Sequence, residues 1–269
     1  MLKHDLRSID ELRKIKARVI PTLGWLNHSF PRLLDPEYWP SLTYDHPFDE
    51  YDRIGITVPS KVTEGTLSEH SSLLKWGMPR DIAGELRQRS GQELEVKLLN
   101  DAHAWLAGAI CHSDLAGQRV DYPCALIALG TGIAFAYAER ADRFKLVEFV
   151  EERIDWTPLR KVADTTAEVY EILGIHFFDT VRREHKDWDF ARICDEFTNR
   201  FTTFLNIVLP HFPFHTLFIG GGHANYLHRS DIRTETPVER VVALRGRTPD
   251  IDVDADLIPL LGVLQLSKD

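Results

Sequence analysis

The order of hydrophobic and polar positions along the chain predicts strands that alternate with helices. The apolar run 124–129 is typical of a strand buried on both faces, and 133–138 continues as a second strand after a glycine turn. Shorter apolar segments predict further strands at 53–59, 94–99 and 216–219. Strands that end abruptly at glycines and lead into helices are typical of an α/β protein, in which ligands bind beyond the carboxyl ends of the strands.

Apolar residues at helical spacing predict helices between these strands. The expected helices cover 9–18, 79–89, 102–111, 163–173, 187–209 and 256–266. The helix over 187–209 presents at core spacing Phe190, Ile193, Phe197, Phe201, Phe204 and Leu205. By contrast, 20–50 contains five prolines and is expected to be irregular, and 60–77 is expected to be a loop.

Composition and charge narrow the classes of function. The chain has 269 residues, of which 43% are hydrophobic and 27% charged, as is ordinary for a globular protein with a substantial core. Its formal net charge is −9 and no cluster of Lys and Arg stands out, which disfavours a nucleic-acid partner. No apolar run approaches the roughly 20 residues that span a bilayer, so we expect no membrane partner.

The three cysteines predict neither disulfides nor a metal site. Cys111, Cys124 and Cys194 are scattered and form no CxxC pair, so we expect no structural zinc and no set of metal ligands. Few, unpaired cysteines and no recognisable signal peptide favour a reducing compartment. We therefore expect a cytoplasmic protein.

An acidic residue follows the predicted strand 94–99. Asp101, with Asn100 before it, stands between this strand and a helix of small residues. An aspartate in such a position could take a proton from a substrate hydroxyl that attacks phosphorus, while the asparagine orients the substrate. Asp and Asn are also favoured helix N-caps whatever a protein does, so both interpretations stay open.

Two glycine-rich turns follow other predicted strands. Gly130-Thr131-Gly132 could let main-chain amides and a hydroxyl approach a phosphate, or could simply close a tight hairpin. Gly220-Gly221-Gly222 could pack against an adenine or a phosphate, or serve as a flexible turn from a strand to a helix. Each motif alone is weak evidence, and their order along the chain is more specific.

Taken in that order, the motifs resemble those of the ROK (repressor, open reading frame, kinase) family. The segments concerned read GITVPS at 55–60, LNDAHAWLAGA at 99–109, LIALGTGIA at 126–134 and FIGGGHAN at 218–225. The family has GIGVPG, ENDAN, LGTGIG and IGGG motifs in this order, and its last helix is similar to 256–266. The resemblance covers about 50–269, which is most of the chain.

This resemblance implies a two-lobed actin-like ATPase (ribonuclease H-like) fold. Residues 1–114 and 252–269 would form a small lobe for the sugar, and 115–251 a larger lobe for the nucleotide. By position, Asp101 would be the catalytic base and Asn100 a sugar contact. ATP with Mg²⁺ would meet the two glycine turns, its phosphates at Gly130, Thr131 and Gly132, and its adenosine at Gly220, Gly221 and Gly222.

The chain departs from the family pattern in ways that bear on activity. No DxGGT phosphate loop is found, so this loop either precedes the printed sequence or the first lobe has been remodelled at its N-terminus. The sugar-binding ExGH segment corresponds to 150–156, where Glu151 or Glu152 could substitute but no His follows. The family's cysteine-rich zinc loop has no counterpart, and His103, to which we assign no role, replaces the second Asn of the NDAN motif.

Three functions therefore stay open. The first is ATP-dependent phosphorylation of a sugar hydroxyl with Asp101 as general base. The second is a catalytically impaired, sugar- or nucleotide-binding or regulatory protein (a pseudoenzyme). The third is a scaffold that forms a homodimer through its aromatic-rich stretch 20–50. We see no winged-helix segment before the resemblance begins, so a repressor role is not expected.

Overall fold

The computed structural model describes two compact units of the chain. The described residues are 53–58, 62–63, 66–67, 81, 83–84, 87–88, 95–130, 132–141, 143–147, 153–244 and 257–266. Those within 1–118 and 256–269 form the first unit, and those within 119–255 form the second. The helix expected over 9–18 and the irregular stretch 20–50 lie outside the described residues.

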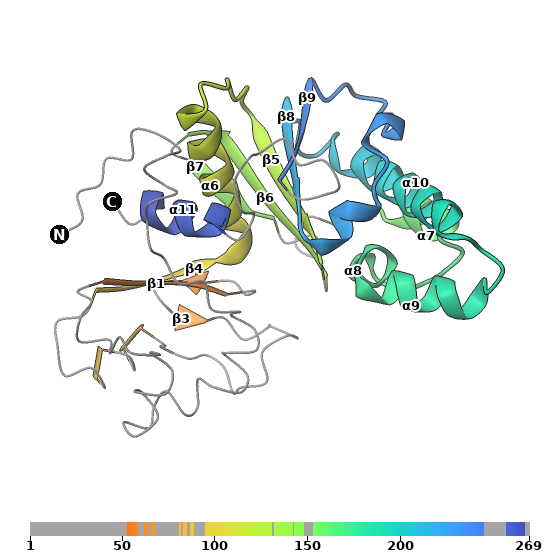
Figure 1. Ribbon diagram of the computed structural model, residues 1–269, viewed down its shortest axis with the longest axis horizontal. Helices are drawn as coiled ribbons and strands as arrows, with labels where there is room; N and C mark the ends of the chain where they lie inside the picture. Colours follow the sequence, from red (N-terminus) through yellow and green to blue (C-terminus); the bar gives the residue numbers. More distant parts are fainter. Residues whose placement is uncertain are drawn as a thin grey trace. The chain divides into compact units, whose positions relative to one another are not determined.

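The first unit is built on two parallel strands. Strand β1 (Arg53–Val58) pairs with β4 (Glu95–Asn100), and their last residues, Val58 and Asn100, face each other in the register. Helix α6 (Asp101–Leu115) follows β4 without an intervening loop, and α11 (Leu257–Leu266) packs along α6. Both helices also contact β1, so they cover one side of the strand pair (Figure 1). The sequence predicted all four of these elements.

The segment that the sequence predicted as a loop over 60–77 is not all loop. Strand β2 (Val62–Thr63) pairs antiparallel with β3 (Thr66–Leu67) in a small hairpin. Strands of two residues are too short to show the alternation from which strands are predicted, which is why the sequence pattern missed them.

Glycines bring α11 close to its neighbours in the first unit. A Cβ on Gly108 of α6 would overlap the backbone oxygen of Ile258, and a Cβ on Gly262 of α11 would overlap that of Ala104. The two helices therefore touch backbone to backbone at this crossing. The small-residue helix seen in the sequence is explained by this contact.

The described part of the second unit contains a five-stranded mixed sheet in the order β7-β6-β5-β8-β9. Its strands are β5 (Cys124–Leu129), β6 (Ile133–Arg140), β7 (Arg143–Leu146), β8 (Thr216–Gly220) and β9 (Arg240–Ala243). The central strand β5 runs parallel to β8 and antiparallel to β6, and β9 continues the parallel half. The hairpin predicted between β5 and β6 is confirmed, whereas β7 and β9 were not predicted.

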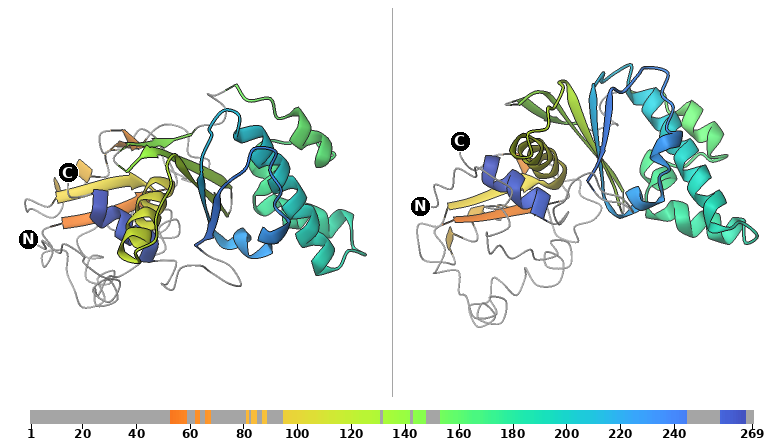
Figure 2. Two further views of the ribbon diagram at one scale, coloured as in Figure 1. Left: turned by 90° about the horizontal axis from the view of Figure 1, so that it is seen from above. Right: turned by 45° about the horizontal axis from the view of Figure 1, so that its top comes forward.

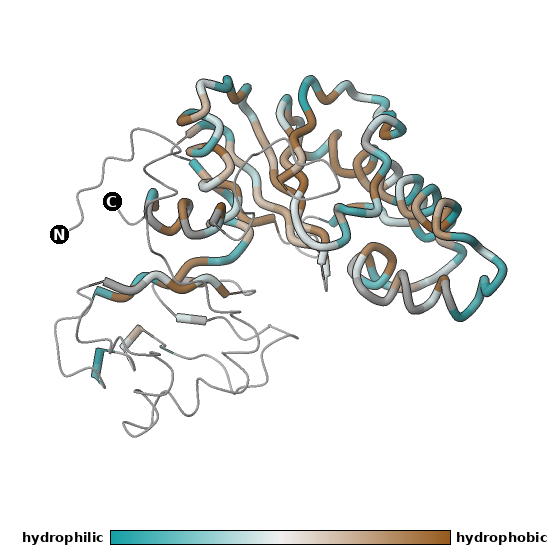
Figure 3. Tube along the Cα trace, viewed as in Figure 1, coloured by the Kyte–Doolittle hydropathy of each residue, from teal (hydrophilic) through white to brown (hydrophobic). Residues whose placement is uncertain are grey.

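Four helices cover one face of this sheet (Figure 1 and Figure 2). They are α7 (Thr157–Val162), α8 (Val169–Leu173), α9 (Ile175–Glu184) and α10 (Phe190–Val208). The apolar stripe of α10 and the inward side chains of β5 and β6 share one core, in which Phe197, Phe201 and Phe204 are fully buried. Hydrophobic residues concentrate accordingly in β5, β8 and the inner side of α10 (Figure 3). Among the helices of the described segments, none is both long and apolar enough to cross a membrane.

Two sequence predictions in this unit are wrong. The helix expected over 163–173 begins only at Val169, because the chain turns at Asp164, whose φ is 49°, between the end of α7 and the start of α8. Phe190, expected in the core, is 45% exposed. It is the first residue of α10, where the carboxylate of Asp189 accepts a hydrogen bond from the Arg192 amide (2.8 Å) and sets the start of the helix.

Candidate functional site

Asn100 is the N-cap of α6. Its side-chain oxygen accepts hydrogen bonds from the amides of Ala102 (2.9 Å) and His103 (3.3 Å). The residue is buried, and its extended backbone (φ −65°, ψ 140°) completes β4 while its side chain starts the helix. Of the two interpretations left open for the Asn100-Asp101 pair, the capping role is filled by Asn100, so Asp101 is not the N-cap of this helix.

Asp101 is the first residue of α6 and is half-buried. Burial raises the pKa of its carboxyl group to about 6, although hydrogen bonds from the amide of Ala102 (2.8 Å) and from its own amide act in the opposite direction. A carboxylate with this pKa is still mostly ionised at pH 7 and is a stronger base than an ordinary aspartate. At the carboxyl end of a strand, it is chemically suited to accept a proton.

The turn between β5 and β6 is closed by a hydrogen bond from the Gly130 amide to the Gly132 oxygen (2.9 Å). Apart from its two neighbours in the chain, no atom of the described residues lies within 4 Å of a Cβ added to Gly130. Packing inside the protein therefore does not require glycine at this position. The space above the main chain is open to a ligand that needs close access to backbone amides. Thr131, the middle residue of this turn, lies outside the described residues.

The second glycine turn joins β8 to a short 3₁₀ helix, η3 (Gly222–Tyr226). Gly220 ends β8, and Gly221 has φ 85° and ψ 163°, a conformation almost restricted to glycine. A Cβ there would also overlap the backbone of Leu129 at the end of β5. Gly221 is thus required by the fold, whereas a Cβ on Gly222 would meet no atom within 4 Å in the described part of the chain, its chain neighbours aside.

Both glycine turns lie at one edge of the sheet in the second unit. Strands β5 and β8 are parallel neighbours, and Ala128 is opposite Gly220 in the register. The residues that follow each strand, Gly130 in one case and Gly221 and Gly222 in the other, therefore emerge side by side at the carboxyl ends. This is the edge at which ligands bind in open α/β sheets.

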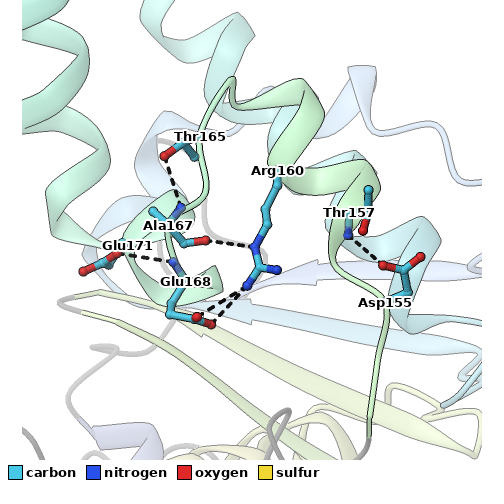
Figure 4. Close-up of polar contacts among 7 residues, drawn as sticks. All are labelled: Asp155, Thr157, Arg160, Thr165, Ala167, Glu168 and Glu171. Carbon is cyan, nitrogen blue, oxygen red and sulfur yellow. Dashed lines mark hydrogen bonds and ion pairs between the residues drawn. The ribbon is translucent and has the colours of Figure 1, made fainter.

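Glu151 and Glu152, the predicted sugar contacts, lie outside the described residues. The chain that follows them is ordered by polar contacts around Arg160 (Figure 4). The Arg160 guanidinium donates to the Ala167 oxygen (3.2 Å) and to the carboxylate of Glu168 (3.4 Å). Glu168 and Glu171 form a capping box at the start of α8. These contacts link α7 to α8 across the turn that the sequence missed.

Sequence reasoning also missed a row of aromatic rings beside the second glycine turn. Tyr226 of η3 contacts Phe190 of α10 at 5.5 Å between ring centroids, and His223 at 6.1 Å. The available signal was the run from His223 to Tyr226 directly after the three glycines, with Phe190 at the start of a helix. The mistaken assignment of Phe190 to the core hid this association.

Solved structures resemble this chain, although no protein-family model and no curated protein sequence matches it. An inorganic polyphosphate/ATP-glucomannokinase from Arthrobacter sp. strain KM aligns with a TM-score of 0.54 and 20% identity, over 81% of this chain and 74% of that one. A ROK-family protein from Streptococcus pneumoniae, in complex with sucrose, aligns with a TM-score of 0.58 and 16% identity, over 90% of this chain and 87% of that one.

The chain has the fold of ROK-family sugar kinases. This is the actin-like ATPase fold, as the sequence motifs predicted. The ROK fold also occurs in a transcriptional regulator, a homolog of the E. coli MLC protein, which aligns with a TM-score of 0.56 and 15% identity over 88% of this chain and 70% of that one. Identities at this level establish the fold and leave the activity to be argued from the site.

Proposed function

We propose that this protein phosphorylates a sugar hydroxyl with ATP. The substrate oxygen gives its proton to the Asp101 carboxylate and attacks the γ-phosphorus, while the bond between that phosphorus and the β–γ bridging oxygen breaks and ADP leaves. Asn100 and either Glu151 or Glu152 would contact the sugar. The observation that carries the proposal is the half-buried Asp101, with a pKa of about 6, at the end of a strand in a sugar-kinase-like fold.

The two glycine turns support the nucleotide part of the proposal. Phosphates would lie against the Gly130-Thr131-Gly132 turn, where the main chain at Gly130 is open to close approach. The adenosine would lie along Gly220-Gly221-Gly222, at the same edge of the sheet. Both turns belong to the second unit, and Asp101 belongs to the first.

Magnesium would enter this site with the triphosphate. Mg²⁺ keeps several of its waters and takes only one or two protein carboxylates in kinase sites, with the substrate phosphates as its main ligands. Within the segments that the structure describes, no three His, Cys, Asp or Glu side chains gather as a metal site.

The decisive test is turnover with ATP, Mg²⁺ and a panel of hexoses and amino-sugars, followed as ADP release and sugar phosphate formation. The full chain is expected to release ADP only when its sugar is present. Asp101→Asn is expected to lower kcat by about 10²–10⁴-fold, because it removes the base and keeps the side chain's size. Calorimetric affinities for sugar and nucleotide should change little in this variant.

A non-catalytic binding or regulatory protein is the second candidate. It is favoured by the ROK-family transcriptional regulator, whose structure aligns with most of this chain. Under this alternative, calorimetry would detect sugar or nucleotide binding, but no sugar phosphate would form at any Mg²⁺ concentration. Equal turnover by the unmodified protein and Asp101→Asn would instead contradict the role proposed for Asp101.

A further inference from the structure

Four rings in the second unit form a row from the core to the surface. Phe197 of α10 is fully buried, and His223 of η3 meets it edge-on at 6.3 Å between ring centroids. Tyr226 lies 6.1 Å beyond His223, and Phe190 lies 5.5 Å beyond Tyr226. The inner rings are held by the core, and the last ring is 45% exposed.

This row of rings lies beside the glycine turns. Helix η3, which carries His223 and Tyr226, begins immediately after Gly221 and contacts β5, β8 and α10. Since β5 runs into the Gly130 turn, the rings and the proposed phosphate-binding turn share the same edge of the same sheet. Both are within one unit, so their arrangement does not depend on the other half of the chain.

The outer pair of this row is an uncharged aromatic surface. Tyr226 is half-buried, and burial lowers the pKa of the neighbouring His223, which keeps its imidazole neutral at pH 7. Large hydrophobic side chains are seldom exposed in the described residues, where only Phe190 and Val162 are so. The planes of the Phe190 and Tyr226 rings are tilted by 60° to each other, so a flat aromatic group that stacks on one ring would meet the other near its edge.

We propose that the base of the bound nucleotide stacks on the Phe190–Tyr226 pair. This inference rests on the proposed nucleotide site and assigns the base to residues beyond the glycine motif. The phosphates would occupy the Gly130 turn, and the ribose would carry the base towards η3 and the start of α10. Because every base presents a π-face, a site that holds the base by stacking accepts adenine and guanine alike.

The test compares ATP, GTP and inorganic tripolyphosphate, each with Mg²⁺, by calorimetry on the full chain. ATP and GTP are expected to bind with affinities within about threefold of each other, and both more tightly than tripolyphosphate. Removing an aromatic side chain on which a base stacks lowers the affinity for the nucleotide roughly 10- to 100-fold. Phe190→Ala and Tyr226→Leu should each weaken ATP and GTP to this extent and leave tripolyphosphate unchanged.

The controls separate stacking from folding. Phe190→Tyr and Tyr226→Phe keep the rings and should bind ATP like the unmodified protein, and Val162→Ala removes the other exposed hydrophobic side chain and should have no effect. Phe190 is exposed, so its alanine variant should keep the melting temperature of the unmodified protein.

Two outcomes would overturn the inference separately from the proposed function. If ATP binds and the ring variants bind it undiminished, or lose tripolyphosphate equally, the base does not stack on this pair although the nucleotide site stands. A strong preference for ATP over GTP would also contradict the stacking proposal, because it would show that the protein recognises the polar groups on the edge of the base. If none of the three ligands binds to the unmodified protein, the nucleotide site itself is wrong and the inference falls with it.

Discussion

At the scale of single residues, Asn100 and Asp101 divide two tasks that their types alone could not distinguish. The side-chain oxygen of Asn100 accepts hydrogen bonds from the amides of Ala102 and His103 and caps the helix, and the Asp101 carboxylate accepts a second hydrogen bond from the Ala102 amide. Asp101 stays at the helix start, where the positive end of the helix dipole favours an anion, but burial raises its pKa. A fold that keeps a carboxylate in such a place loses stability at neutral pH.

This cost predicts how the stability of Asp101→Asn depends on pH. The folded pKa of about 6 is higher than the ordinary aspartate pKa of 3.8, so the stabilising contribution of Asp101 is complete below about pH 4 and is lost as the pH rises through 6. At pH 8, Asp101→Asn is therefore expected to raise the free energy of unfolding by about 1–2 kcal/mol, since the loss of a helix-dipole interaction offsets part of the gain.

Urea unfolding at pH 8 and at pH 4.5, where the two proteins should be nearly equally stable, measures this difference. A variant that is less stable than the unmodified protein at pH 8 would show that ionised Asp101 is stabilising, and that its pKa is not raised.

Two glycines with positive φ allow the stability cost of backbone strain to be separated from the cost of steric overlap. Gly117 has φ 66°, and an added Cβ would contact none of the described residues beyond its chain neighbours. Gly221 has φ 85°, and an added Cβ would overlap Leu129. Gly117→Ala should cost about 1–2 kcal/mol of stability through backbone strain alone. Gly221→Ala should cost roughly 3 kcal/mol or more, because overpacking adds to the strain.

Thermal unfolding of the two variants side by side checks this order. Gly130→Ala is a useful third member of the series, because neither strain nor overlap is expected there and its melting temperature should not change. An equal cost at Gly117 and Gly221 would mean that the end of β5 moves freely away from the turn.

At the scale of elements, α6 is positioned by its contact with α11. The backbones meet at Gly108 and Gly262, which lie more than 140 residues apart in the sequence. The Lys97 ammonium of β4 also donates a hydrogen bond to the backbone oxygen of Leu266 at the end of α11. The strand and the helix that flank Asp101 are therefore both held by the last helix.

A methyl group at this crossing is expected to reverse the usual effect of replacing glycine in a helix. Glycine to alanine normally stabilises a helix by up to about 1 kcal/mol. Gly262→Ala should instead destabilise the protein by about 1–3 kcal/mol, since the methyl group would overlap the backbone of Ala104. Gln265→Ala, at an exposed position of the same helix, is the control and should change the stability by less than about 0.5 kcal/mol. A stabilised Gly262→Ala would show that the helices are not in backbone contact.

Arg160 shows how a local polar cluster decides where elements end. Its contacts with Ala167 and Glu168 close the turn after α7, and the capping box of Glu168 and Glu171 starts α8. The Arg160–Glu168 ion pair is largely exposed and is worth at most about 1 kcal/mol. The hydrogen bond to the Ala167 main chain defines the turn more firmly, because it is directed at the backbone.

At the scale of the whole molecule, the candidate groups are divided between two compact units. Asn100 and Asp101 belong to the first, and the two glycine turns and the aromatic rings belong to the second. Under the proposed function, the sugar and the nucleotide would thus each depend mainly on a different unit.

This division predicts independent effects of variants in the two units. Gly130→Val should weaken ATP binding, because its side chain fills the open space over the hairpin turn, and should leave sugar affinity within about twofold. Asp101→Asn should leave ATP affinity unchanged, because Asp101 acts on the proton of the sugar hydroxyl. Calorimetry with ATP alone and with the sugar alone measures the two affinities separately. A Gly130→Val protein that loses sugar binding while keeping its melting temperature would contradict the assignment.

The sequence was a sufficient guide to elements with a continuous apolar pattern and to motifs at strand ends. Strands β1, β4, β5, β6 and β8 and helices α6, α10 and α11 were all expected close to where they are. It failed where a local pattern was short or ambiguous. The edge strands β7 and β9 have only four residues each. Phe190 has the spacing of a core residue, but as the first residue of α10 it is exposed.

The amino-acid sequence by itself determined the α/β class, the order of the motifs and the placement of Asp101 between a strand and a helix, because these depend on residues close together in the chain. Only the tertiary structure decided the rest. Parallel pairing of β5 with β8 brings Gly130 next to Gly221, and burial raises the pKa of Asp101. The aromatic row from Phe197 to Phe190 forms only when η3 packs on α10. Register, burial and ring contacts arise between segments distant in the chain, and hydrophobic periodicity carries no information about them.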